Sequence, residues 1–229
     1  MVRPSDDLSR YKVVFAPHLF ILADAAARRM SDYVRDGGIL VADCRTAVKD
    51  GTGLVHARIL PGLLSDALGI SIDEYEALYE GMRYALACKP PFSAKHTGSM
   101  FADWVRPRGA EVLAGFDEWH LRPYAAATRN RFGKGFGYYV ATIVDEESFY
   151  DELVADLVQR AGLTPAATAP RGVEAVIREG RGGKVLFLIN HTEERQVVNV
   201  PAGKRELLTG GLTGATVTLE PYGVAVIRL

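Results

Sequence analysis

The stretch of sequence that decides the fold covers residues 12–42 and reads KVVFAPHLFILADAAARRMSDYVRDGGILVA. Residues 12–17 are apolar, β-branched and aromatic, which predicts a buried strand. Residues 24–36 repeat apolar side chains at helical spacing, and Gly37-Gly38 ends that helix because glycine accepts the left-handed cap position. Residues 39–42 form a second apolar run. A strand, a helix and a strand at this spacing predict a βαβ unit with two parallel strands.

The middle of the chain predicts a less regular continuation of this unit. A loop follows at residues 44–60, and Pro61-Gly62 begins a short helix that ends before Gly69. Apolar and β-branched runs predict further strands at residues 82–88, 110–116, 125–132 and 138–141. Residues 92–109 show no clear period, and we predict an irregular segment there. Residues 146–161 form an amphipathic helix that Gly162 caps.

A change of pattern near residue 165 indicates a domain boundary. The segment TPAATAPRG at residues 164–172 carries two prolines and little apolar bulk, which is typical of a linker. Short strand patterns separated by turn residues follow, with no helical period. We therefore predict an α/β domain at residues 1–165 and a small antiparallel β-sandwich domain at residues 170–229.

Composition and charge exclude several classes of function. The 229 residues are 48% hydrophobic and 24% charged, and the net charge of −1 gives no basic surface for nucleic acid or an anionic membrane. No apolar run approaches the roughly 18 residues of a membrane span, and the N-terminus lacks a signal-peptide pattern. The two cysteines, Cys44 and Cys88, lie in no metal-ligand spacing. We expect a cytoplasmic protein without cofactor, metal, nucleic-acid partner or membrane partner.

A series of short phrases, in order along the chain, resembles family 42 of the glycoside hydrolases, the β-galactosidases. In the first domain these phrases are DLSRYKVV (7–14), YVRDGG (33–38), PGLL (61–64), TRN (128–130) and FGKG (132–135). In the second domain they are LFLINH (186–191), LLTG (207–210) and PYGV (221–224). The order and spacing of the phrases cover nearly the whole chain.

The resemblance implies a fold and a function. The family's middle domain has a flavodoxin-like fold similar to class I glutamine amidotransferases and joins subunits into trimers, and a small β domain follows it. Both catalytic glutamates of the family lie on a preceding TIM barrel, which needs roughly 250 residues by itself. We therefore expect an N-terminally truncated α/β domain, a non-catalytic oligomerisation role, and no hydrolysis by this chain alone. The expected partners are identical copies, in a trimer or an edge-paired dimer, and a barrel encoded upstream.

The alternative to an oligomerisation role depends on Cys44. It directly follows a predicted parallel strand, where α/β enzymes place a nucleophile and where amidotransferases use cysteine. The alternative is a free-standing amidotransferase-like enzyme or a small-molecule binder. However, Asp43 and Arg45 flank the cysteine where a tight turn favours glycine, and no His-x-Glu pair follows the last strand of the domain. We expect a buried, inert thiol and no catalytic residue.

The remaining candidate sites have simpler interpretations. The glycines of residues 133–137 are followed by a strand rather than a helix, which favours a hairpin over a phosphate loop. The acids at residues 73–76 and 145–147 are expected to be solvated or helix-capping charges. The five histidines share no metal spacing. Trp104, Trp119 and His120 suggest either a sugar-binding surface, as in a carbohydrate-binding module, or packing in the core or between subunits.

Overall fold

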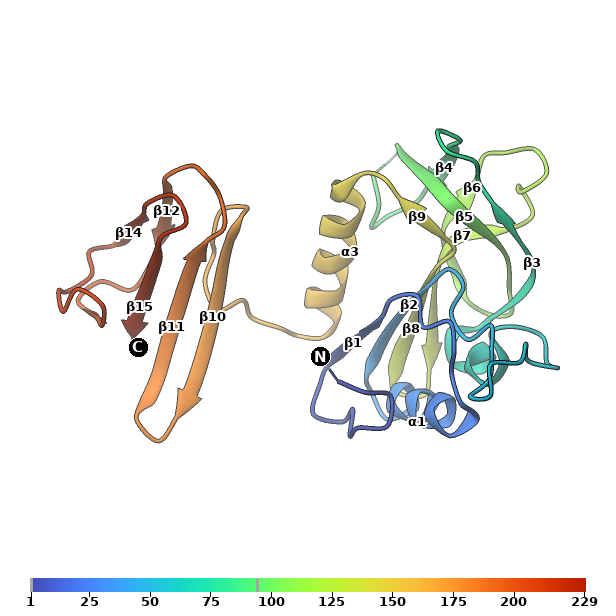
Figure 1. Ribbon diagram of the computed structural model, residues 1–229, viewed down its shortest axis with the longest axis horizontal. Coiled ribbons are helices and arrows are strands. Elements are labelled where there is room, and N and C mark those ends of the chain that lie inside the picture. Colours follow the sequence, from blue (N-terminus) through green and yellow to red (C-terminus); the bar gives the residue numbers. More distant parts are fainter. Residues whose placement is uncertain (1, 94) are drawn as a thin grey trace. The chain divides into compact units, whose positions relative to one another are not determined.

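The computed structural model describes residues 2–93 and 95–229 and divides the chain into two compact units (Figure 1). The first unit covers residues Met1–Gly162 and the second covers Leu163–Leu229. Each unit buries a separate hydrophobic cluster. The units are therefore described one at a time.

The first unit begins with the predicted βαβ element. Strand β1 (Val13–Ala16) pairs in parallel with β2 (Ile39–Asp43), and helix α1 (Asp24–Arg35) connects them. The helix buries Ala26, Met30 and Val34, as its period predicts. The βαβ prediction is confirmed, including the parallel direction of the two strands.

A glycine hairpin extends this element. Strand β8 (Gly135–Val140) pairs in parallel with β2, and β7 (Ala125–Phe132) pairs with β8 in the antiparallel direction. A side chain at Gly135 would place its Cβ 2.1 Å from the carbonyl oxygen of Gly38, so the close packing of hairpin and α1 requires glycine. Gly133 adopts a φ of 61° at the turn. The hairpin interpretation of residues 133–137 is confirmed.

The rest of the sheet is antiparallel. The first unit also contains β3 (Ile70–Ala77), β4 (Tyr84–Cys88), β5 (His96–Pro107), β6 (Glu111–Phe116) and β9 (Thr142–Val144). Across the described residues the strand order is β1-β2-β8-β7-β6-β4-β5-β3, with β9 beside β5. Strand β5 also pairs with β7, so the antiparallel part curls back on itself (Figure 1).

Few helices cover this sheet. Besides α1, the described residues of the first unit contain the turn η1 (Gly62–Leu64), the four-residue α2 (Ser65–Leu68) and α3 (Glu147–Arg160). Hairpins join most strands between β4 and β8, and a hairpin makes its two strands antiparallel. The structure is thus a mixed, mostly β sheet. The predicted flavodoxin-like or amidotransferase-like fold, with a parallel sheet between helices, is not confirmed.

Strand β5 corrects a second expectation, because most of the predicted irregular segment at residues 92–109 is a twelve-residue strand. Its pairing with β9 shifts register between Ser99 and Ala102, where Met100 has a left-handed φ of 62°. This bulge interrupts the alternation of apolar and polar residues. A sequence period of two is therefore lost although the strand continues.

The second unit consists of small antiparallel sheets. Strands β10 (Val173–Gly180), β11 (Gly183–Asn190), β15 (Val224–Arg228) and β13 (Arg205–Glu206) form one sheet, and β12 (Gln196–Asn199) pairs with β14 (Thr216–Leu219). Leu186, Leu188 and Ile227 of the larger sheet share a core with Val198 and Leu219 of the smaller one. Antiparallel sheets around one core agree with the predicted β domain.

Candidate functional site

The loop after β2 holds the cysteine on which the enzymatic alternative depends. Cys44 is fully buried. Burial, and after it the nearby carboxylates of Asp103 and Asp43, raise the pKa of the Cys44 thiol far above its ordinary value. A reactive cysteine needs a low pKa and access to solvent. The geometry therefore gives no support to Cys44 as a nucleophile.

A buried carboxylate fixes the same loop. Asp103 accepts hydrogen bonds from the Tyr139 hydroxyl at 2.6 Å and from the Arg45 backbone N–H at 2.8 Å. Burial raises the pKa of Asp103, and these hydrogen bonds oppose the rise. The Arg45 guanidinium stacks on the Tyr75 ring, 3.4 Å from its centroid. Arg45 and Ala47 have left-handed φ values of 66° and 57°, so these contacts maintain a strained turn.

The loop, the segment before α1 and strand β3 together present an apolar surface, here called the loop patch and defined by Ile21, Leu54, Val55 and Tyr75. Between 45% and 69% of the surface of each of these residues is exposed. Single bridges link Ile21 to Lys49 and Lys49 to Val55. Val55 and Tyr75 also line a groove of about 390 Å³, whose other lining residues are apolar (Phe20, Val48, Leu60 and Ile72) or charged (Arg45, Lys49, Asp73 and Glu74). A group of exposed apolar side chains beside a groove is typical of a protein-binding surface.

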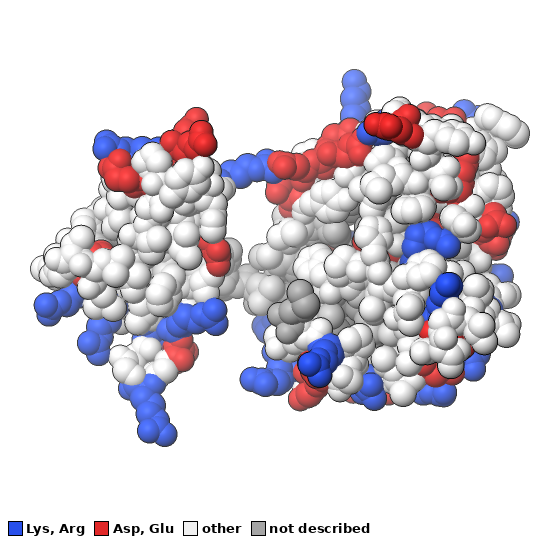
Figure 2. Space-filling model, viewed as in Figure 1, with Lys and Arg blue, Asp and Glu red and all other residues white. Residues whose placement is uncertain are grey.

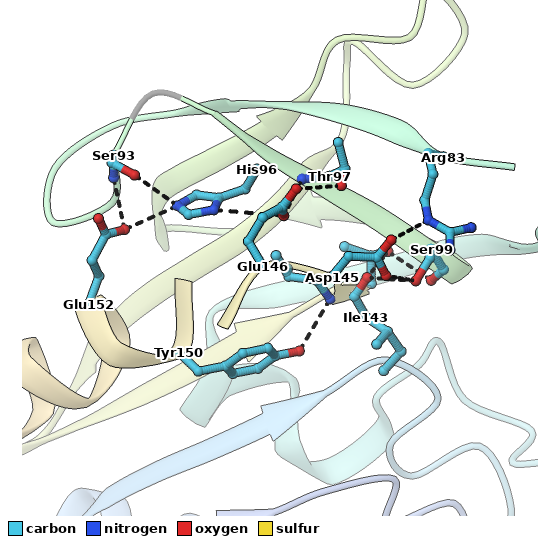
Figure 3. Close-up of polar contacts among 12 residues, drawn as sticks. Arg83, Ser93, His96, Thr97, Ser99, Ile143, Asp145, Glu146, Tyr150 and Glu152 are labelled. Carbon is cyan, nitrogen blue, oxygen red and sulfur yellow. Dashed lines mark hydrogen bonds and ion pairs between the residues drawn. The ribbon is translucent and has the colours of Figure 1, made fainter. Parts of the chain in front are cut away.

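A polar cluster lies where β9 leads into α3 (Figure 3). The buried His96 places its Nε2 3.1 Å from Ser93 Oγ and 3.1 Å from Glu152 Oε2. A catalytic triad needs its serine and its carboxylate on opposite ring nitrogens. Here both lie at Nε2, and Nδ1 is 3.8 Å from Glu146 and has no hydrogen-bond partner among the described residues. The cluster resembles a Ser-His-Glu set in composition but lacks its geometry.

The carboxylates of this cluster act within the fold. Asp145 accepts a hydrogen bond from Ser99 at 2.6 Å and pairs with Arg83. The Ser99 hydrogen bond lowers the pKa of Asp145. Burial acts to raise the pKa of Glu146, but hydrogen bonds from Thr97 outweigh it and lower that pKa. Figure 2 shows acidic side chains gathered on the first unit near the start of α3. These contacts attach the start of α3 to β5. Glu146 occupies the N-cap position of α3 but makes no side-chain cap hydrogen bond, so the capping role expected for residues 145–147 is not confirmed.

The other predicted candidates are dispersed over the first unit. Cys88 is half-buried, and burial raises the pKa of its thiol to about 11. Asp73 pairs with Arg106, and Glu76 contacts His120. Among residues 2–93 and 95–229, no group of three histidine, cysteine or acidic side chains is placed to hold a metal ion. The same residues include no helix long and apolar enough to cross a membrane.

Three of the candidates do come together. The rings of Trp119 and His120 are 5.3 Å apart between centroids, and those of His120 and Trp104 are 6.4 Å apart. The loop patch, Asp103 and the His96 cluster were not predicted from the sequence. The aliphatic residues of the 44–60 loop were a signal for the patch, because a solvated loop is usually polar.

Two protein-family models match this chain. The family model of the β-galactosidase trimerisation domain matches residues 1–164, and the family model of the β-galactosidase C-terminal domain matches residues 172–229. The chain belongs to glycoside hydrolase family 42. The matches correspond to the middle and C-terminal parts that the sequence phrases indicate, and they give no support to an amidotransferase.

Individual members of family 42 align along nearly the whole chain. β-Galactosidase LacZ of Heyndrickxia coagulans is 31% identical over 228 residues, covering 100% of this chain and 34% of that protein. β-Galactosidase BglY of Alicyclobacillus acidocaldarius is 33% identical over 228 residues, covering 96% and 33%. The crystal structure of β-galactosidase from Bacillus circulans sp. alkalophilus superimposes with a TM-score of 0.92 at 30% identity, covering 99% of this chain and 34% of that one. The chain thus spans about a third of the length of the family 42 relatives it matches.

Proposed function

We propose that this chain assembles the subunits of a β-galactosidase-like glycoside hydrolase, and that its first unit joins three copies. The observation that carries the proposal is the match of a trimerisation-domain model to residues 1–164, the unit that also exposes the loop patch. The relatives that align with the whole chain are β-galactosidases. The chain accordingly contributes assembly rather than the hydrolytic residues.

The loop patch is the surface proposed to contact a second copy. The aliphatic side chains of Ile21, Leu54 and Val55 need no hydrogen-bond partner, so their burial against another subunit stabilises the complex by removing apolar surface from water. The contacts of Asp103 and Arg45 hold the loop in one conformation before association. A rigid surface loses less conformational entropy on binding than a flexible one. Closed symmetry then limits the assembly to a defined size.

Two observations bear on the compartment and on the competing function. Cys44 and Cys88 are free thiols, which fits the reducing cytoplasm proposed from the sequence. The buried Cys44 gives the amidotransferase-like alternative no accessible nucleophile. The cytoplasmic location remains a proposal that fractionation of the native host would test.

Light scattering across a dilution series tests the assembly. A mass of three 25.0 kDa chains is expected for the parent protein, whereas two chains would indicate the edge-paired dimer. Val55→Asp introduces a charge into the loop patch and should shift the equilibrium toward monomer. Val197→Asp is the matched control, because Val197 is similarly exposed but lies in the second unit. A folded parent protein that stays monomeric, or equal effects of both variants, would refute the proposal.

A further inference from the structure

In the second unit, the four-stranded sheet is apolar on both of its faces. Leu186 and Leu188 of β11 belong to the core of that unit. Because side chains along a strand alternate between faces, the residues between and beside these leucines point away from that core. The register of β10, β11 and β15 groups such residues on one surface, here called the outer face and defined by Val176, Val185, Phe187, Ile189, Val224 and Val226. A strand that is apolar on both faces is typical of a sheet that is covered on both faces.

The outer face contributes to neither hydrophobic core of the described residues. Val224 is 45% exposed, and the other residues of the outer face are partly exposed. Val185 and Phe187 line a groove of about 460 Å³ that Arg178 and Arg228 border. A contiguous apolar surface with a polar rim is typical of a site that binds another protein.

Three arginines lie in one row across the sheet, at the end of the outer face nearest the β10–β11 hairpin. The register aligns Arg178, Arg228 and Arg205, with Val185 between the first two. Arg228 and Arg205 are directly opposite each other, an arrangement in which like charges repel. Arg178 and Arg205 have no ion-pair partner among the described residues. A carboxylate of a binding partner at this end would relieve the repulsion.

The opposite end of the second unit is acidic. Glu174 lies on the outer face itself, because it is in register with Ile189. The side chain of Asn190 donates hydrogen bonds to the backbone carbonyls of Glu194 and Glu220, at 2.7 and 2.9 Å, which places both acids at this end. Figure 2 shows mostly Lys and Arg at the hairpin end of the second unit and most of its Asp and Glu toward the other end. The outer face thus has an apolar centre between two ends of opposite charge.

A face with this pattern is complementary to a copy of itself. A second sheet, laid on the outer face with its strands running the opposite way, brings each basic end over an acidic end. Arg178 and Glu174 are each two residues from Val176 on the same strand. A twofold axis that crosses the strands at Val176 therefore places Arg178 over the partner's Glu174, and Glu174 over the partner's Arg178. A contact between identical surfaces requires this reciprocity.

We propose that the outer face binds the outer face of a second copy of this chain, about a twofold axis that crosses the strands at Val176, Phe187 and Val226. These three residues are neighbours in the register, so apolar side chains meet at the centre of the contact. An acidic protein of another kind would be attracted by only one end of the face. An anionic membrane would likewise be repelled by the acidic end. The contact is separate from the loop patch and joins two of the proposed assemblies.

The size of the face indicates a weak contact. Four strands, each about six residues long, present roughly 350 Å². That is about half of the roughly 800 Å² that each partner buries in a stable interface. The pairing should therefore appear only at high protein concentration, above the range in which the loop patch assembles the first units.

Sedimentation analysis of the full chain over a concentration series up to about 1 mM tests the pairing. The mass of the parent protein should rise from three chains toward six, and that of Val55→Asp from one chain toward two. A parent mass that rises from one chain to two would retain this inference and remove the proposed trimer. Raising the salt concentration should weaken the pairing, because the charges at its ends are exposed.

A charge swap locates the contact. Arg178→Glu and Glu174→Arg each place like charges over one another at two symmetry-related positions, so each should weaken the pairing at least about tenfold. The double variant restores opposite charges and should pair within a few-fold of the parent protein. Arg131→Glu is the matched control, because Arg131 is an exposed arginine of the first unit. Circular dichroism checks that each variant is folded.

Several results would overturn the inference. One is a mass that does not change with concentration, and another is a double variant that pairs as weakly as the single ones. Loss of pairing in Arg178→Glu without loss in Glu174→Arg would also overturn it, because a reciprocal contact requires both. A chain that does not pair but binds vesicles of phosphatidylglycerol through the same arginines would assign the outer face to a membrane instead.

Discussion

Replacement of Asp156 by alanine is expected to destabilise the first unit more than any other single carboxylate substitution on α3. The Asp156 carboxylate is buried and accepts hydrogen bonds from Tyr138, from Arg129 Nη1 at 3.2 Å and from Arg160 Nε at 3.0 Å. Tyr138 lies on β8, Arg129 on β7 and Arg160 on α3. One carboxylate therefore attaches the C-terminal half of α3 to two central strands.

The magnitude follows from what the substitution leaves unpaired. Breaking a buried ion pair by removing one partner costs about 3–5 kcal/mol. Arg129 keeps Glu111 at 2.7 Å, which favours the lower end of that range. Tyr138 is 1% exposed, and a hydroxyl buried without its acceptor costs about 1–3 kcal/mol. These contributions overlap, so Asp156→Ala should reduce the free energy of unfolding by about 3–4 kcal/mol. For a domain of this size that corresponds to a fall of roughly 10 °C in Tm.

The loss should also depend on pH with a definite sign. Burial acts to raise the pKa of Asp156, but the hydrogen bonds from Tyr138 and Arg160 outweigh it and lower the pKa below its ordinary value of 3.8. A lowered carboxylate pKa contributes stability above 3.8 and loses it as the pH falls toward the folded-state pKa. The difference between parent and variant should therefore shrink below pH 3.8.

Urea unfolding followed by tryptophan fluorescence measures this loss in the first unit alone, because Trp104 and Trp119 both lie there. Arg160→Ala is the matched control. It removes one partner but leaves Asp156 bonded to Arg129 and Tyr138, so a loss of about 1 kcal/mol is expected. The reasoning is refuted if the two variants lose the same stability, or if Asp156→Ala loses less than about 1 kcal/mol.

Three further outcomes are expected. Hydrogen bonds to Glu206 from Val226 and Thr209 overcome the effect of its burial and lower its pKa from 4.5 to about 2. Glu206→Gln should therefore reduce the stability of the second unit by about 2 kcal/mol at neutral pH and remove the change in its stability between pH 4.5 and 2. Urea unfolding followed by circular dichroism at several pH values measures both effects. Burial raises the pKa of both thiols, so iodoacetamide at neutral pH should leave Cys44 unmodified in the native chain, as measured by mass spectrometry. Rapid modification of Cys44 in preference to Cys88 would contradict its buried position. Limited proteolysis should cleave between Thr164 and Arg171 before it cleaves inside either unit, and first cuts within a unit would argue against a flexible linker.

Sequence periodicity correctly predicted the elements in which each face is either consistently buried or consistently exposed. The βαβ element is an example, because β2 is buried on both faces and α1 buries one stripe. The glycine hairpin at residues 133–135 is another, since its turn chemistry is encoded in adjacent residues. The second unit was predictable for the same reason, as turn residues regularly separate its strands.

The curled antiparallel half was not predictable in the same way. Strand β5 pairs with four other strands over twelve residues and carries a bulge, so its side chains have no constant period. A flavodoxin-like sheet was inferred by extending the parallel βαβ pattern to the strands that follow. Those strands are joined by hairpins, which is a property of the connections rather than of the strands themselves.

The candidate site is formed by contacts between residues that lie far apart in the sequence. Asp103 lies 58 residues from Arg45 and 36 from Tyr139, and a sequence period carries no information about such a contact. The position of Cys44 after a parallel strand was predicted correctly, whereas its environment could be known only from the structure.

The distribution of polar partners indicates what the buried carboxylates do within each unit. A catalytic carboxylate must keep a free acceptor or proton directed at a substrate. In contrast, Asp103, Asp156 and Glu206 are each buried and accept hydrogen bonds from groups of their own unit. Such carboxylates determine where a loop or helix sits, and in the first unit one of them supports the loop that exposes Val55. The loop patch, in contrast, leaves apolar side chains open to solvent. Burial against another protein surface is the interaction that we propose for these side chains.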